Sequence, residues 1–241
     1  MNKQNKYYIF VLLSFLILPN FLFAEELADS EINEKIEAFI LEHPEVIVES
    51  INRYEKKMRS ENDIRKQEFL QSNREMIFNT SDKMFEGNEN GKIKLVEFFD
   101  YNCGYCKASH REIHDLLTEH QDLLVIYKPF PILGPLSLEY ARYGLAVSEL
   151  GKFKEFHNEM FTHKGPIKEK DVESIIEKIG LDFSVVKIMI NKTEYRENIK
   201  ESIFIAQSLG LQGTPAFVLE DEIINKFVTK EALEKKFMEI R

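Results

Sequence analysis

The pattern of apolar and polar residues divides the chain into a helical N-terminal part and an α/β part. From residue 25 to residue 81 there is no glycine and a single proline, Pro44, and apolar residues recur at helical spacing. From about residue 82, turns rich in glycine and asparagine separate runs of strand length from helical stretches. The pattern predicts a helical extension over residues 25–81 and a domain over residues 82–241.

The extension is expected to contain two helices that meet at Pro44. The first helix carries one apolar face: Ile32, Ile36, Phe39 and Ile40. The second carries apolar residues spaced four, three and four apart, which is the a/d seam of a coiled coil: Ile47, Ile51, Tyr54 and Met58. This seam is compatible with a helix that packs on its own domain and with an oligomerisation stalk, and the sequence leaves both open.

The domain begins with the order strand, helix, strand. "IKLVEFFD" (93–100) and "LLVIYKPF" (123–130) are nearly continuous apolar runs, as expected for strands covered on both faces. The segment between them, residues 107–120, has helical spacing, and "EGNENGK" (86–92) is interpreted as a turn. This order predicts a βαβ unit with a parallel sheet.

The second half of the domain is mostly helical. Residues 136–209 show no strand pattern and form an insert of roughly 70 residues, too long to be a structureless loop. Strand patterns return at 216–219 and 222–224, and a last helix is expected over 230–240 with Thr229 as its N-cap. The predicted fold class is therefore α/β, with an inserted helical domain and a preceding helical extension.

The first 24 residues have the features of a secretory signal peptide. Lys3 and Lys6 precede an apolar run, and Ala24 is a small residue at which a signal peptidase could cut. The alternative is an uncleaved membrane anchor, although the run is short and is interrupted by Pro19. Cleavage removes two lysines, so the formal net charge falls from −9 to −11. Such an acidic chain is not expected to bind nucleic acid or an anionic membrane surface.

Both cysteines of the chain, Cys103 and Cys106, lie in "NCGYC", and three uses compete. A structural zinc site needs four ligands, but there is only one cysteine pair, and the neighbouring His110 and His114 lack the glutamate of a zincin motif. A structural disulfide across two residues would close a very short loop and stabilise little. In an exported chain, a redox-active pair is the best interpretation.

The position of the pair explains how it could work. A strand that ends at Asn102 places Cys103 at the start of the following helix, where unpaired N–H groups and the helix dipole favour a thiolate. Cys103 should therefore have a pKa below its ordinary value and act as the attacking thiol. Cys106, one turn later, should face inward, have a higher pKa and resolve the mixed disulfide.

"VEFFDYNCGYC", followed by a helix, a helical insert and "GTPAFVL", resembles the DsbA-like branch of the thioredoxin superfamily. The resemblance covers about residues 84–241. It implies that the Thr214–Pro215 peptide bond is cis and faces the cysteines, where the Thr214 backbone would pair with an extended substrate. It also implies a buried acid six residues before the first cysteine, at Glu97. A neutral-range Glu97 beneath Cys106 could accept or return its proton; the alternative is an exposed Glu97 beside Lys94 or Lys128.

Two features depart from the strong oxidases of that family. Those enzymes resemble Cys-Pro-His-Cys with valine before the cis proline, whereas this chain has Gly104-Tyr105 and Thr214. These residues are similar to those of DsbC-type isomerases, and they are expected to line the substrate-binding site together with Pro215. Members of the ScsC type also resemble this chain in carrying an N-terminal helical extension, and such extensions can trimerise.

The sequence thus predicts an exported thiol-disulfide oxidoreductase, periplasmic or secreted, that needs no cofactor. Its expected partners are unfolded or misfolded secreted proteins, a membrane redox partner and other copies of the same chain. Whether it is an oxidase or an isomerase stays open. Two other classes stay open as well: a protein that binds Cu(I) through the two thiolates, and a non-enzymatic interaction protein that acts through its stalk.

Overall fold

The computed structural model describes residues 31–240, so the predicted signal peptide, residues 1–24, lies outside the described residues. Among the residues that are described, no helix combines the length and the apolar character that crossing a bilayer requires. The chain divides into two compact units, and the division falls between Asn62 and Asp63.

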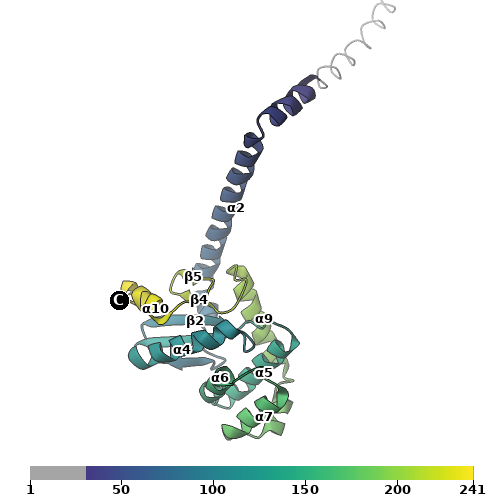
Figure 1. The fold of residues 1–241 in the computed structure, drawn as a ribbon. Coiled ribbons are helices and arrows are strands. Elements are labelled where there is room, and N and C mark those ends of the chain that lie inside the picture. Colours follow the sequence, from purple (N-terminus) through teal and green to yellow (C-terminus); the bar gives the residue numbers. More distant parts are fainter. Residues whose placement is uncertain (1–30, 241) are drawn as a thin grey trace, which may run out of the picture. The chain divides into compact units, whose positions relative to one another are not determined.

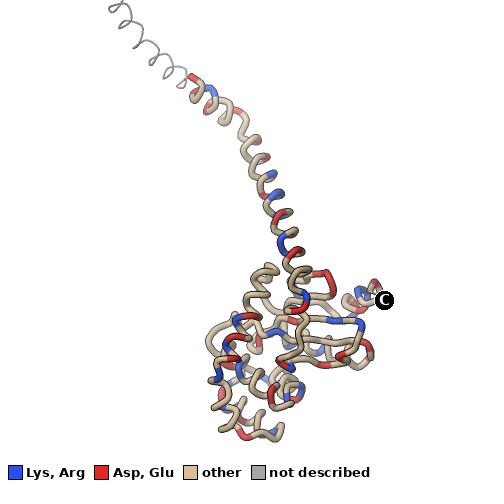
Figure 2. The backbone as a smooth tube through the Cα atoms, turned by 180° about the vertical axis from the view of Figure 1, so that it is seen from behind, with Lys and Arg blue, Asp and Glu red and all other residues tan. Residues whose placement is uncertain are grey.

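The first unit is helical. Residues 31–42 form one helix that ends before Pro44, as predicted, because the residue before a proline disfavours helical backbone. Helix α2 (Glu45–Ser72) follows, and it continues past the division into the second unit. Acidic and basic residues interleave along α2 (Figure 2), and some of them pair one turn apart, as Glu55 does with Arg59 at 2.8 Å.

The apolar seam of α2 is exposed in the described chain. Ile47, Ile51 and Tyr54 retain 43%, 53% and 64% of their exposure. Three large apolar residues on one helical face gain little from facing water. Whether this part of the helix is an oligomerisation stalk stays a prediction.

The second unit contains the remaining helices and all strands of the described chain (Figure 1). In chain order they are α3 (Arg74–Ile77), β1 (Phe85–Gly87), β2 (Ile93–Phe99), α4 (Gly104–Glu119), β3 (Leu123–Pro129), α5 (Pro135–Glu149), α6 (Phe153–Thr162), α7 (Glu169–Lys178), α8 (Phe183–Met189), α9 (Thr193–Ser208), β4 (Ala216–Leu219), β5 (Glu222–Ile224) and α10 (Lys230–Ile240). The α/β class is confirmed, and so is the helical insert, which runs from α5 to α9.

The strands within residues 31–240 form one mixed sheet in the order β1-β3-β2-β4-β5. β2 and β3 are parallel, which confirms the predicted βαβ unit, and β4 pairs antiparallel with β2. The interpretation of residues 86–92 as a turn was wrong at its start, because Glu86 and Gly87 belong to β1. This edge strand is only three residues long and is ordered by antiparallel pairing with β3, which its own sequence does not signal.

Helices cover both faces of the sheet (Figure 1). On one face, apolar residues of α4, α6 and α10 pack against the sheet, for example Ile113, Phe156 and Phe237. On the other face, α9 packs together with Leu70 of α2 and Ile77 of α3. Leu70 and Ile77 are fully buried, so the end of the predicted extension contributes to the core of the second unit.

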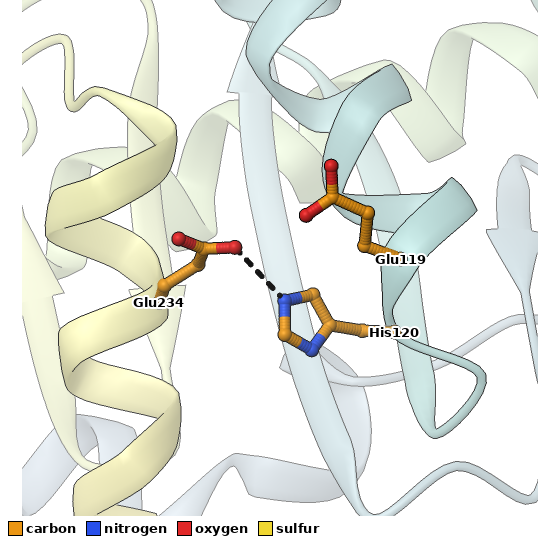
Figure 3. Close-up of side chains that lie close together, drawn as sticks. All are labelled: Glu119, His120 and Glu234. Carbon is orange, nitrogen blue, oxygen red and sulfur yellow. Dashed lines mark hydrogen bonds and ion pairs between the residues drawn. The ribbon is translucent and has the colours of Figure 1, made fainter.

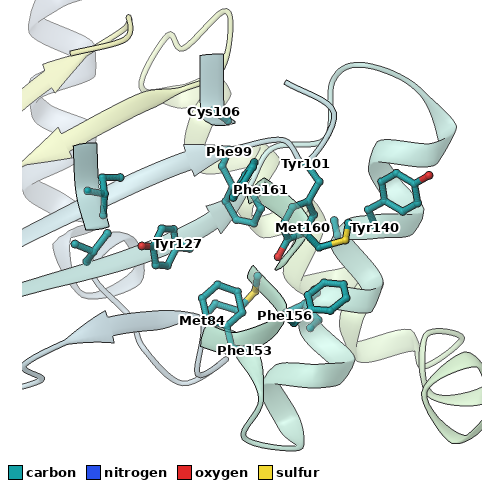
Figure 4. Packing of buried hydrophobic residues seen from close by; sticks show 14 of the residues in the cluster. Met84, Phe99, Tyr101, Cys106, Tyr127, Tyr140, Phe153, Phe156, Met160 and Phe161 are labelled. Atoms are coloured by element: carbon teal, nitrogen blue, oxygen red, sulfur yellow. The ribbon is translucent and has the colours of Figure 1, made fainter. Parts of the chain in front are cut away.

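Residues of β2 alternate between the two faces. Val96 and Phe98 point to the face covered by α9, whereas Leu95 and Phe99 point to the face covered by α4. Figure 4 shows the aromatic packing around Phe99 on this second face, where its ring lies 4.9 Å from that of Tyr101. Glu97 has the parity of Phe99, so its carboxyl group lies on the face that α4 covers.

Candidate active site

The two cysteines lie at the start of α4. Cys103 is the N-cap residue, with extended backbone (φ −83°, ψ 120°), and Cys106 lies in the first turn. Both cysteines are buried, but Cys103 keeps 7% of its exposure, whereas Cys106 keeps none. Both thiols are free. The strand was expected to end at Asn102, but β2 ends at Phe99, and a short turn leads from it into α4. The start of the helix therefore still lies at one end of the sheet.

Cys103 has the environment of a stabilised thiolate. A hydrogen bond from the Cys106 thiol is the main cause that lowers the pKa of Cys103 to about 6, against the opposing effect of burial. The Thr214 side chain and the backbone N–H groups of Cys106 and Tyr105 act in the same direction. When protonated, the Cys103 thiol donates to the Thr214 carbonyl oxygen at 3.1 Å.

Cys106 has the opposite environment. Burial is the largest cause that raises its pKa well above the ordinary value, and the hydrogen bond to Cys103 and the charge of Glu97 add to it. A buried thiol without a positive neighbour strongly resists ionisation. At neutral pH, Cys103 is therefore ionised in an appreciable fraction of molecules, and Cys106 remains a thiol.

Glu97 lies beneath this pair. Its side chain is 1% exposed, so the alternative of an exposed Glu97 beside Lys94 or Lys128 does not hold. The pKa of Glu97 is raised to about 8, mainly by burial and to a smaller extent by the nearby charges of Cys103 and Glu86. Ser109 opposes this shift, but no hydrogen bond of normal geometry joins its hydroxyl to either carboxyl oxygen. A buried acid with unpaired oxygens is poised to exchange a proton.

The loop before β4 faces the cysteines. The Thr214–Pro215 peptide bond is cis, as the resemblance implies. Thr214 is partly buried and contacts Cys103 through its carbonyl oxygen, while Pro215 is buried. The sequence-predicted site residues therefore converge on one place, although Thr214 follows Cys103 by more than a hundred residues in the chain.

The two residues between the cysteines are exposed. A side chain at Gly104 would meet no atom within 4 Å, so packing does not demand glycine there. Tyr105 is 70% exposed, and its ring lies 6.4 Å from that of Phe227. The surface beside Cys103 is therefore open and partly aromatic.

Two buried polar groups were not predicted from the sequence. Asp100 is 2% exposed, and its carboxylate accepts backbone hydrogen bonds close to the cysteines. His157 of α6 is fully buried, and its Nδ1 atom lies 3.2 Å from the Tyr101 hydroxyl. Burial lowers the pKa of His157 far below its ordinary value, so it is neutral. Asp100 could have been found from its position directly after an apolar strand, whereas the sequence around His157 carries no such signal.

The histidines near the cysteines do not form a metal site with them. His110 is nearly buried among aromatic rings, and its Nε2 atom lies 3.2 Å from Oδ1 of Asn158. The ring of His114 lies 6.5 Å from that of His110. Their helical spacing therefore reflects one side chain in the core and one at the surface.

One cluster within residues 31–240 has the composition of a cation site: Glu119, His120 and Glu234 (Figure 3). His120 Nε2 lies 3.3 Å from Glu234. Lys230 forms an ion pair with Glu119 and lies 3.9 Å from Glu234. Because this lysine already balances the acids, the cluster is explained as a polar contact between the ends of α4 and α10.

Known proteins match this arrangement. The model of the "DSBA-like thioredoxin domain" family matches residues 94–237. A thioredoxin-like oxidoreductase from Silicibacter pomeroyi DSS-3 is 34% identical, with 69% of this chain and 96% of that chain covered and a TM-score of 0.67. The thiol-disulfide exchange protein alpha-DsbA2 from Wolbachia pipientis is 28% identical, with 76% and 98% covered and a TM-score of 0.69. The catalytic domain of Proteus mirabilis ScsC is 26% identical, with 72% and 97% covered and a TM-score of 0.66.

Curated relatives match over a shorter stretch. The Na(+)/H(+) antiporter NhaA 1 of Mycobacterium sp. (strain KMS) is 26% identical over 136 residues, which is 54% of this chain and 22% of the antiporter. The chain thus spans about a fifth of the length of this relative. The family match, the fold and the identity to the Silicibacter protein agree with one another: the chain belongs to the DsbA-like family of thioredoxin-fold thiol-disulfide oxidoreductases.

Proposed function

We propose that this protein exchanges disulfides with secreted proteins through Cys103 and Cys106. Cys103 is the attacking thiol and Cys106 the resolving thiol. The observation that carries this proposal is the contrast between the two cysteines: Cys103 keeps some exposure and has a pKa of about 6, whereas Cys106 is fully buried and has a raised pKa. A nucleophile must be both ionised and accessible, and of the two only Cys103 is.

The exchange takes two steps. The Cys103 thiolate attacks one sulfur of a substrate disulfide, forms a mixed disulfide and releases the other substrate sulfur as a thiolate, which takes a proton. Cys106 then loses its proton and attacks the Cys103 sulfur, which releases the second substrate thiolate. The substrate disulfide is reduced by two electrons and the pair is oxidised to a Cys103–Cys106 disulfide; the reverse sequence oxidises a substrate.

Glu97 is the proposed proton acceptor in the second step. Cys106 is a poor nucleophile until its proton leaves, and the carboxyl group of Glu97 is close enough to influence its pKa. With a pKa of about 8, Glu97 can both accept and return a proton near neutral pH. Its burial keeps this exchange local, because water does not compete for its oxygens.

The substrate is proposed to lie over Cys103 and the loop before β4. Thr214 and Pro215 present backbone next to the thiol, and Gly104 and Tyr105 form the open surface on the other side. An exposed aromatic ring suits the apolar side chains of unfolded proteins. Correctly folded proteins bury such side chains, so this surface favours unfolded or misfolded partners.

We place the protein in the periplasm or outside the cell, because the first 24 residues resemble a cleavable signal peptide. A disulfide-exchanging pair also suits an oxidising compartment. There, a membrane redox partner is expected to reset the pair after each turnover.

Self-association through residues before about 80 is part of the proposal. The exposed seam of α2 offers the surface, and linking several active sites raises their effective concentration at one substrate. Together with Gly104-Tyr105 and Thr214, this arrangement favours an isomerase over a monomeric oxidase. An isomerase must hold a misfolded substrate long enough to rearrange more than one disulfide.

Binding of Cu(I) is the weaker alternative. A two-thiolate copper site needs both sulfurs ionised, and the raised pKa of Cys106 opposes the second ionisation. A stoichiometric Cu(I) complex that survives competition with glutathione would favour this alternative over disulfide exchange.

The assignment of the two thiols is tested by trapping. Cys106→Ser should accumulate mixed disulfides with an unfolded disulfide-containing protein, because nothing resolves them, whereas Cys103→Ser should accumulate none. Alkylation at pH 6 should modify Cys103 far faster than Cys106. Equal alkylation rates, or trapping by Cys103→Ser, would reject the proposed roles.

A further inference from the structure

The turn that carries Cys103 is joined to the segment after β3 by a buried carboxylate. Asp100, the residue that follows β2, is 2% exposed. One of its oxygens, Oδ1, accepts a hydrogen bond from the backbone of Asn102 at 2.9 Å. The other, Oδ2, accepts from the backbones of Ile132 and Leu133, each at 3.0 Å.

These hydrogen bonds add to the pairing of β2 with β3, which already brings the two segments near each other. The Asp100 carbonyl oxygen also accepts from the Cys103 N–H group at 3.0 Å, so one residue contacts both the cysteine turn and residues 132–133. A second connection lies nearby, where the Asn102 side-chain amide donates to the Ser137 hydroxyl at 2.9 Å. Charge-assisted bonds to backbone N–H groups are short and directional, so they determine the position of the segment that they join.

The segment held in this way is unusually apolar for an exposed loop. Ile132, Leu133 and Leu136 are exposed by 42%, 55% and 52%. The backbone nitrogens of Ile132 and Leu133 lie 3.0 Å from the carboxylate of Asp100, which is three residues before Cys103. Exposed apolar side chains cluster where a protein binds a partner, and a partner bound there would lie next to the attacking thiol.

We propose that Asp100 is a positioning residue that fixes the segment Ile132–Leu136 beside Cys103, where its apolar side chains contact an extended, unfolded polypeptide substrate. This inference rests on the proposed function and adds a determinant of substrate class to it. Asp100 does not touch the reacting sulfurs through its carboxylate. It acts by keeping the apolar segment next to the Cys103 thiol.

Asp100→Asn is the informative variant, because an amide has the same shape but only one accepting oxygen. Its oxygen can accept from the backbone N–H of Asn102 or from those of Ile132 and Leu133, but not from both sides. Its NH₂ group then faces the remaining N–H donors and cannot accept from them. Asp82→Asn is the matched control. Asp82 is also a largely buried acid that accepts a backbone bond from two residues later, at Met84, but its other contacts are to Lys128 and not to the site.

The measurement compares two disulfides: a small aromatic disulfide, which needs only Cys103, and an unfolded peptide disulfide with apolar flanking residues. Asp100→Asn should lower the ratio of kcat/KM for the peptide to that for the small disulfide by about tenfold, mainly through KM. Asp82→Asn should leave the ratio unchanged. The double variant Ile132→Ser, Leu133→Ser should lower the ratio in the same way, and adding Asp100→Asn to it should have little further effect.

Three outcomes would overturn the inference. Equal losses for both disulfides would mean that Asp100 acts on Cys103 itself, and an unchanged ratio would mean that the segment is not a substrate contact. If Asp100→Asn does not fold, an unchanged ratio in Ile132→Ser, Leu133→Ser still rejects the inference. An unmodified protein that exchanges neither disulfide would instead reject the proposed function.

Discussion

The two ends of helix α2 differ in what their apolar residues contact. Near its start, Ile51 and Tyr54 remain exposed, whereas near its end Leu70 is fully buried against the sheet of the second unit. Both ends share the same helical backbone and the same alternation of charges. The same amphipathic pattern therefore has two different outcomes along one helix: its end completes the core of the second unit, whereas its start leaves apolar residues exposed.

The largest expected effect comes from shortening the chain at two places. A chain that begins at Ser81 lacks Leu70 and Ile77, both fully buried. Losing a buried side chain of this size costs about 2–5 kcal/mol, and a domain has only about 5–15 kcal/mol in total. The Ser81 chain should therefore unfold at much lower denaturant, or fail to fold, while a chain that begins at Asp63 should keep the full-length midpoint. Equal midpoints for the two shortened chains would show that the end of α2 is dispensable.

The second prediction concerns the start of α2. Ile51→Asp places a charge on the seam and should convert the full-length protein into a monomer, as measured by light scattering at micromolar concentrations. Val48→Asp is the control, because Val48 is equally exposed but lies off the seam. Refolding of a scrambled multi-disulfide protein should fall about tenfold in Ile51→Asp and not in Val48→Asp. A full-length protein that is already monomeric would reject self-association.

The third prediction is that the pH dependence of stability arises in the second unit, from Glu97. The pKa of Glu97 is raised to about 8, so between its unfolded pKa near 4.5 and pH 8 the native state binds the extra proton. Stability due to this group is therefore greatest below pH 4.5 and falls as pH rises through the window, by about 1.4 kcal/mol per pH unit at most. Glu97→Gln, which cannot ionise, should lose this slope.

Denaturant unfolding at pH 5, 5.5 and 6 measures that slope, below the range in which the lowered pKa of Cys103 contributes a slope of opposite sign. It should be the same in the full-length protein and in the Asp63 chain, because all groups near Glu97 belong to the second unit. In Glu97→Gln, resolution of the mixed disulfide near neutral pH should also become slower, since Cys106 loses its proton acceptor. An unchanged resolution rate would reject that role while leaving the stability argument intact.

The smallest expected effect concerns Thr214. Its side chain is one of the causes that lower the pKa of Cys103 to about 6. Thr214→Val keeps the shape but removes the hydroxyl, so the pKa of Cys103 should rise by roughly half a unit to one unit. Thiolate absorbance as a function of pH measures this directly. Thr118→Val, far along α4 with its hydroxyl bonded to the His114 carbonyl, should leave the titration unchanged.

Much of the fold followed from local pattern. The strands β2 and β3, the helix between them and the insert have strong periodic signals, because each buries one face or both in a large core. The edge strand β1 was not predicted, because three residues that are ordered only by pairing with β3 carry no periodic signal. The burial of Leu70 and Ile77 was not predicted for a related reason. The apolar face of a helix is visible in the sequence, but the element that packs against it is not.

The sequence by itself determined the chemistry. The spacing of Cys103 and Cys106, their position at the start of a helix and an acid inside an apolar strand are local features, and each has a local physical consequence. The start of the helix also predicted the direction in which the pKa values of the two thiols differ. Only the tertiary structure supplied the further causes of that difference, because burial, the Thr214 loop and the carboxyl group of Glu97 come from other parts of the chain. The same holds for Asp100, whose carboxylate gains its role only when folding brings Ile132 and Leu133 to it. Electrostatic environments depend on neighbours in space, and a sequence specifies those neighbours only through the complete fold.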